Sequence, residues 1–181
     1  MENIFNNLNQ SLFSYLRKNE NLIISFRGEN SQFIRFNNSL IRQTGLVDDA
    51  EIELKFISNG RICVGGLTVS GNLDVDLKNG YEEIKRMRKE TLEIPEDPFL
   101  VFPQNSGSSK DIKTSKGLPF ENAVDAILPS ISGIDFVGIL ANGKMFRGNA
   151  NNLGQKHWFE TDTFSLDFSL VTKNHQMVKG S

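Results

Sequence analysis

Two long segments of the chain carry apolar residues at steps of three and four, the spacing of an amphipathic helix with one buried face. The first segment covers residues 4–16. The second begins after Asn72, a residue type that caps helices, and should end before Pro95. A shorter helix is expected from Pro119, which suits a first helical position, to Pro129, which should stop it. The pattern therefore predicts about three helices.

The remaining apolar segments alternate with polar residues or lie between turn residues, as β-strands do. Strands are expected at residues 22–26, 32–37, 40–44, 51–56, 61–69, 134–141, 144–150 and 163–170. Turn residues at 28–30 and 37–38 should separate the first three strands. Asn59-Gly60 and Asn142-Gly143 have the composition of two-residue hairpin turns. Because helices interrupt runs of hairpin-linked strands, we predict an α+β fold with a largely antiparallel sheet.

The distribution of proline and glycine suggests how the chain is organised. A chain of 181 residues, 38% of them hydrophobic, can bury one core, so a single domain over residues 1–181 is the first expectation. Residues 96–117 combine prolines and glycines with a centre rich in Ser and Lys, which predicts a long surface loop with disorder at its middle. The alternative is two lobes, residues 1–95 and 118–181, joined by this loop.

Charge and cysteine content indicate which partners and which cellular compartment to expect. The 20 Lys and Arg residues nearly balance the 22 Asp and Glu residues, so the chain has no overall field that would attract nucleic acid or anionic lipid. The single cysteine, Cys63, lies in an apolar run, as buried thiols do in a reducing compartment. We find no secretory signal and no run of the roughly 20 apolar residues that span a bilayer. A cytoplasmic protein without a membrane partner is expected.

The residue types of hydrolytic sites do not occur at the required spacing. His157 and His175 are the two histidines, and neither has a partner one helical turn away, so a zinc site of the two-His type is not expected. Cys63 has no neighbouring base. The glycines at 65–66 and 148–154 do not form a phosphate loop and are better explained as turns and close strand contacts. We therefore predict no catalytic and no metal-binding residue.

One cluster of cations, residues 85–89, could suggest contact with nucleic acid. Glutamates lie three and four residues from these cations along the expected helix, at positions 82, 83, 90 and 93. This spacing favours a solvated helix face with ion pairs over a nucleic-acid patch.

Several motifs resemble those of the TldD/TldE (PmbA) zinc metalloprotease family. In that family a strand of the form F-V-G-I-Y is followed by R-G-x-A-N-S-x-G-Q-x-x-W and then by S-F-x-x-D-x-S. The similar stretches, together with those that resemble the family's N-terminal meander and its P-E-D-P loop, are residues 34–43, 59–66, 95–98, 136–139, 146–158 and 165–170. Leu140, Asn149 and Asn152 depart from the family pattern, which indicates a distant member.

The resemblance implies an N-terminal α/β domain of a longer protein. The family's HExxxH metal helix belongs to a C-terminal metallopeptidase domain that is absent from residues 1–181, so zinc is implied for the family's catalytic subunit and not for this chain. The implied partners are the chain's own C-terminal domain, a homo- or heterodimer partner of the same family, and an unfolded peptide substrate. The implied reaction of the intact protein is peptide hydrolysis. The alternative is a non-catalytic scaffold module of the metal-free subunit type.

One short segment combines amide, guanidinium and indole groups. Its residues are Arg147, Asn151, Asn152, Gln155 and Trp158. In one interpretation the amides satisfy backbone groups of a loop and the Trp fills the core. In the other, suggested by the resemblance, the segment lines the peptide chamber or the subunit interface, because amides and Arg bind extended backbone and Trp anchors contacts. The sequence leaves both interpretations open.

Overall fold

The computed structural model describes residues 1–104, 106–115, 118–172, 174 and 176–181. These residues form two compact units, each assembled from three segments of the chain. Unit 1 comprises Met1–Gly28, Asp49–Ile112 and Phe146–Phe159. Unit 2 comprises Glu29–Asp48, Lys113–Met145 and Glu160–Ser181. These boundaries differ from lobes at 1–95 and 118–181, because four long strands each contribute residues to both units.

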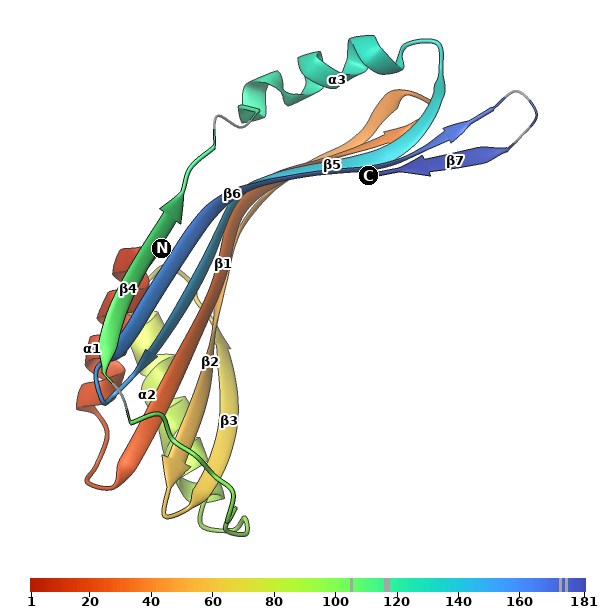
Figure 1. The fold of residues 1–181 in the computed structure, drawn as a ribbon. Coiled ribbons are helices and arrows are strands. Elements are labelled where there is room, and N and C mark those ends of the chain that lie inside the picture. The colour runs from red at the N-terminus through yellow and green to blue at the C-terminus, as the bar shows by residue number, and fades with distance from the viewer. Residues whose placement is uncertain (105, 116–117, 173, 175) are drawn as a thin grey trace. The chain divides into compact units, whose positions relative to one another are not determined.

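The strands belong to one antiparallel sheet, which confirms the predicted α+β class (Figure 1). In chain order they are β1 Glu20–Asn37, β2 Leu40–Ser58, β3 Arg61–Thr68, β4 Gly107–Lys113, β5 Asp135–Asn151, β6 Gln155–Val171 and β7 Met177–Gly180. The strand order is β3-β2-β1-β5-β6-β4, and β7 pairs with β6. The helices are α1 Glu2–Ser14, α2 Leu73–Glu90, the 3₁₀ turn η1 Phe120–Asn122 and α3 Ala123–Ile131.

The first two helices and one hairpin confirm the sequence pattern. Asn72 caps α2, since its Oδ1 accepts hydrogen bonds from the backbone N–H groups of Asp74 and Val75 at 3.1 and 3.3 Å. Asn59 and Gly60 have φ angles of 50° and 70°, as a type I′ turn requires, and they place Ser58 opposite Arg61. Local turn and cap chemistry was sufficient to predict these features.

The prediction of a turn at residues 28–30 is wrong, because β1 continues through these residues without a break. A Cβ added to Gly28 would lie 3.1 Å from the Phe26 ring and 3.2 Å from the carbonyl oxygen of Asp49 on β2. Gly28 therefore permits close contact between strands instead of a reversal. In the same way, the separate strands expected at 40–44 and 51–56 form the single strand β2.

The hairpin expected at Asn142-Gly143 is also wrong, because both residues lie inside the continuous strand β5. Asn142 is buried and bonded on both sides: it accepts from Gln32 Nε2 at 3.0 Å and donates to the Leu118 carbonyl at 2.9 Å. A Cβ added to Gly143 would overlap the backbone of the neighbouring strand at Asn30. Tertiary contacts, and not turn formation, explain this dipeptide.

The region after α2 differs from the prediction at three points. Strand β4 lies within the loop expected at 96–117, of which Asn105, Lys116 and Gly117 are outside the described residues. Pro129 does not stop α3, since that helix continues to Ile131. Strand β7 was not predicted.

No helix among the described residues is long and apolar enough to cross a membrane.

Each unit has its own core between helix and sheet. In unit 1, α1 and α2 pack against β1, β2 and β6 through a buried cluster that includes Phe5, Leu12, Phe26 and Ile84. In unit 2, α3 covers one face of the sheet and buries a second cluster, built on Ile34, Phe36, Phe136 and Leu140.

Candidate functional site

The turn between β5 and β6 holds three of the five candidate residues, and its geometry is set by their amides. Asn151 is 2% exposed, and its Oδ1 accepts hydrogen bonds from the backbone N–H groups of Leu153 and Gln155 at 2.9 and 3.1 Å. The Asn151 Nδ2 group donates to Gln155 Oε1 at 3.0 Å. Asn151 and Gln155 therefore close the turn on itself.

Asn152 attaches this turn to the start of β1. Its Oδ1 accepts from the backbone N–H of Leu22 at 2.8 Å, and its Nδ2 donates to Asn21 Oδ1 at 3.2 Å. The backbone N–H of Asn152 also donates to the Leu22 carbonyl at 3.3 Å. The side chain thus continues the strand pairing past the end of β5.

Trp158 fills the core of unit 1. It is 4% exposed, and its ring centroid lies 5.5 Å from that of Phe5, 5.6 Å from Phe26 and 6.1 Å from Phe146. These separations are typical of favourable aromatic pairs. The indole Nε1 has no hydrogen-bond partner among the described residues.

Arg147 differs from the other four candidates because its side chain is exposed. Its Nη1 donates to the Phe146 carbonyl at 2.8 Å, which leaves most of the guanidinium free for contact. Two residues on, Asn149 Nδ2 donates to Ser25 Oγ on β1 at 3.2 Å. The structural interpretation therefore accounts for Asn151, Asn152, Gln155 and Trp158, whereas a role of any of the five in a chamber or interface stays a prediction.

Unit 1 has an open hollow of about 500 Å³ on its sheet. Side chains of β1 and β2, including Ser25, Arg27, Glu51 and Glu53, line it together with the glycine-containing end of β3. Arg27 and Glu51 form an ion pair across the strands at 3.7 Å. The hollow therefore presents hydroxyl, charged and backbone groups together with the apolar side chains of Val64 and Leu67.

Cys63 and His157, the described cysteine and histidine, each have surroundings that are not those of a catalytic pair. Cys63 is buried, and both burial and the nearby Glu90 carboxylate raise the pKa of its thiol, which disfavours the reactive thiolate. His157 Nδ1 lies 2.8 Å from Ser109 Oγ on β4. His175 lies outside the described residues. Within those residues the structure contains no group of three or more His, Cys, Asp and Glu side chains that could hold a metal ion.

Three of the four cations of residues 85–89 form ion pairs, two of them within α2. Lys85 binds Glu82 at 2.7 Å, and Arg86 binds both Glu83 and Glu90. Arg88 forms two hydrogen bonds with Glu20, at 2.6 and 2.8 Å. These pairs agree with a salt-bridged helix face and leave little free charge for phosphate groups.

Unit 2 contains a hollow that the sequence interpretation missed. Its volume is about 510 Å³, and Arg35, Arg42 and Lys179 line it together with Val137 and Ile139. We call it the cationic groove. A signal for it exists in the sequence, since Arg35 and Arg42 stand at equal distances from the turn at Asn38 and Ser39, and such positions share one face of a hairpin.

Comparison with known proteins gives matches in structure but not in sequence. No family model matches the sequence, and a search of curated proteins finds no match either. A "putative modulator of a DNA gyrase" from Thermotoga maritima superposes with a TM-score of 0.68 at 14% identity, over 97% of this chain and 42% of that one. TldE from Thermococcus kodakarensis gives a TM-score of 0.63 at 14% identity, over 98% and 40%.

A third solved structure, a "putative modulator of DNA gyrase" from Bacteroides thetaiotaomicron, gives a TM-score of 0.66 at 16% identity, over 96% of this chain and 42% of that one. The chain thus spans about two fifths of the length of these structures. The resemblance drawn from the sequence motifs is confirmed at the level of the fold, which is that of the N-terminal part of TldE and of the DNA gyrase modulator structures.

Proposed function

We propose that this chain is the supporting N-terminal domain of a cytoplasmic TldD/TldE-like metallopeptidase, in which it helps to form the peptide chamber and the subunit interface. The observation that carries the proposal is the superposition over 97% of the chain on a structure of which it covers 42%. Catalysis would belong to the remaining part of the longer protein or to a partner subunit. The chain's own residues would bind and orient the peptide.

Exposed polar groups on unit 1 support the chamber part of the proposal. The hollow beside Ser25 and Glu53 and the exposed guanidinium of Arg147 offer hydrogen-bonding groups without a reactive centre. Such groups bind the backbone of an unfolded peptide whatever its sequence.

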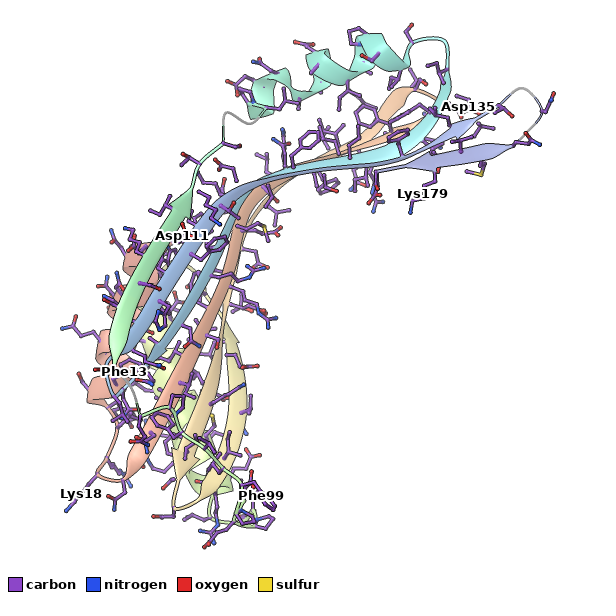
Figure 2. The ribbon with its side chains drawn as sticks, in the orientation of Figure 1. Phe13, Lys18, Phe99, Asp111, Asp135 and Lys179 are labelled. Carbon is purple, nitrogen blue, oxygen red and sulfur yellow. The ribbon has the colours of Figure 1, made fainter. Side chains whose placement is uncertain are left out.

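Exposed apolar residues in the segment after α2 support the interface part. Leu92, Phe99 and Val101 are 78, 86 and 84% exposed, and Figure 2 labels Phe99. Large apolar side chains that are this exposed favour a surface that another protein surface covers. A homo- or heterodimer partner or the chain's own C-terminal domain would supply that surface.

Zinc content and peptide hydrolysis test the proposal when measured on the 181-residue chain and on the longer protein. We expect about one zinc per longer protein, hydrolysis of an unstructured peptide by it, and neither property in the 181-residue chain. Absence of both from the longer protein would favour the alternative, a scaffold module of the metal-free subunit type. Stoichiometric zinc in the 181-residue chain would contradict the proposal.

A further inference from the structure

The sheet of unit 2 has one face covered by α3 and one open face. Ile34 and Phe36 of β1 and Phe136 and Leu140 of β5 are buried in the cluster beneath α3. Side chains alternate between the faces of a strand, so Arg35, Val137 and Ile139 belong to the opposite face. The cationic groove lies on that face.

The groove crosses five neighbouring strands. In unit 2 these follow one another as β2, β1, β5, β6 and β7. Arg42 and Arg35 stand on the first two, Val137 and Ile139 on the third, and Lys179, which Figure 2 labels, on the last. The pairing of β6 with β7 places Lys179 opposite Ser169. Cations therefore occupy both ends of the groove, and Val137 and Ile139 of β5 and Asp167 and Ser169 of β6 line it between them.

The two arginines are an unfavourable pair in the absence of a ligand. Counting outward from the two-residue turn at Asn38 and Ser39 pairs Arg35 with Arg42 across the strands. Like charges opposite one another destabilise a sheet. Neither arginine, nor Lys179, has a carboxylate partner among the described residues, whereas Lys144 in the same unit binds both Glu160 and Asp162 at 3.1 Å.

One carboxylate, that of Asp167 on β6, also lines the groove. It forms no ion pair with the three cations among the described residues. The lining therefore carries three positive charges and one negative charge. An anionic ligand would separate the arginines, and its apolar groups would cover Val137 and Ile139.

We propose that the cationic groove binds an extended polypeptide segment that has acidic side chains near both ends and apolar side chains between them. Four strand spacings separate β2 from β7, about 19 Å, which corresponds to about six residues of extended chain. The volume of about 510 Å³ is within the range of ligand-binding pockets. Guanidinium groups form strong paired hydrogen bonds with carboxylates, and the apolar side chains of Val137 and Ile139 distinguish a peptide from a nucleic acid.

The test is fluorescence anisotropy of the 181-residue chain with a labelled eight-residue peptide that has two Glu residues at each end and Leu or Val between them. We expect saturable binding that weakens with added NaCl, and no binding of the matched peptide with Lys in place of Glu. The double substitution R35Q/R42Q should raise Kd about tenfold or more, because two charge-assisted contacts are lost.

Two variants serve as controls for this test. Asp167→Asn should lower Kd, because it removes a repulsive charge without removing a cation. The double substitution K18Q/K78Q makes the same change in charge on exposed residues of unit 1 and should leave Kd unchanged. Thermal melting of each variant shows whether it is folded.

Three outcomes would overturn the inference: equal binding of the Glu and Lys peptides, an unchanged Kd in a folded R35Q/R42Q variant, or displacement of the peptide by duplex DNA at lower concentration than by free Glu peptide. The inference rests on the proposed function in taking a polypeptide as ligand, but the two can fail separately. Loss of zinc and hydrolysis with intact Glu-peptide binding removes only the proposed function. Hydrolysis by the longer protein without such binding removes only the groove.

Discussion

The guanidinium group of Arg88 joins three parts of unit 1. It forms an ion pair with Glu20 at the start of β1, donates to the Tyr15 carbonyl after α1 at 3.4 Å, and lies 5.3 Å from the centre of the Tyr15 ring. The Glu20 side chain is 7% exposed, and it also accepts from the backbone N–H of Arg17 at 2.8 Å. Both charges are therefore shielded from water and depend on each other.

Glu20→Gln should lower the free energy of unfolding by about 2–4 kcal/mol, because it leaves the partly buried Arg88 charge without its partner. Chemical denaturation at neutral pH measures this change. The control Glu82→Gln removes an exposed carboxylate that pairs with Lys85, and it should change stability little. Equal effects of the two substitutions would contradict the assigned role of Glu20.

The same pair predicts how stability depends on pH. Burial alone would raise the pKa of Glu20, but the hydrogen bonds from Arg88 and the Arg17 backbone and the charges of both arginines outweigh it and hold the pKa below 4.5. A lowered folded-state pKa stabilises the fold above the unfolded-state value and loses this effect as pH falls through the folded-state value. The difference in stability between wild type and Glu20→Gln should therefore be constant near neutral pH and shrink below about pH 4.5.

For individual residues, the sequence identifies which side chains are candidates for a role but does not show which other residues they contact. Composition identified the amide-rich segment and Trp158 but left two interpretations open, and the structure supplies the hydrogen bonds and ring contacts that place four of these residues in a turn and a core. The cationic groove required knowing that β7 pairs with β6, and β7 itself was not predicted. Strand β7 has only four residues, too few to show the alternation that identifies a strand.

At the scale of elements, glycines decide how closely segments approach. Gly80 lies inside α2, and a Cβ added there would be 2.7 Å from Leu12 Cδ2 on α1. Leu12 is fully buried and has little room to move. The glycine is therefore retained for helix packing, although glycine is a poor residue for a helix interior.

Gly80→Ala should destabilise unit 1 by about 1–2 kcal/mol, because the overlap with Leu12 outweighs the gain in helix propensity. The neighbouring exposed residue provides a matched control: Asn79→Ala should be neutral or slightly stabilising. Thermal melting of both variants distinguishes packing from propensity, and a stabilised Gly80→Ala variant would contradict the close contact of α1 and α2.

Gly143→Ala tests the correction that β5 is continuous. The added methyl group would overlap the backbone of β1, so a loss of about 2 kcal/mol or more is expected. Gly107 has a similar φ, 149° compared with 154°, but no atom lies within 4 Å of an added Cβ. Gly107→Ala should therefore cost less, and equal melting temperatures of the two variants would favour an exposed hairpin at residue 143.

Helices were easier to predict than the connections between strands. Periodicity and a cap identify α1 and α2, because both depend on neighbouring residues. Gly28 and Gly143 lie in sequences that are typical of turns. In the structure they lie within strands and allow close contact with a neighbouring strand, because tertiary packing overrides local turn preference. Strands of 17–19 residues are also longer than usual, so short strands were the natural expectation.

At the scale of the molecule, the central pairing of the sheet joins distant parts of the chain. Strand β1 lies between β2 and β5, so Glu20–Asn37 pairs with Asp135–Asn151. Folding should therefore be slow for a chain of this size, in milliseconds to seconds. The single Trp158 reports on the core of unit 1, and stopped-flow fluorescence measures the rate. Complete refolding within microseconds would contradict the expectation that pairing of β1 with β5 limits the rate of folding.

The position of β5 in the chain has a consequence for synthesis on the ribosome. Strand β1 can pair with β2 soon after both have emerged, but its other edge has no partner until β5, more than a hundred residues later, has been made. At ordinary rates of translation this delay lasts on the order of ten seconds. During that time the backbone N–H and C=O groups along that edge of β1 have no partner in the sheet, so the unfinished chain exposes an edge on which another chain could pair.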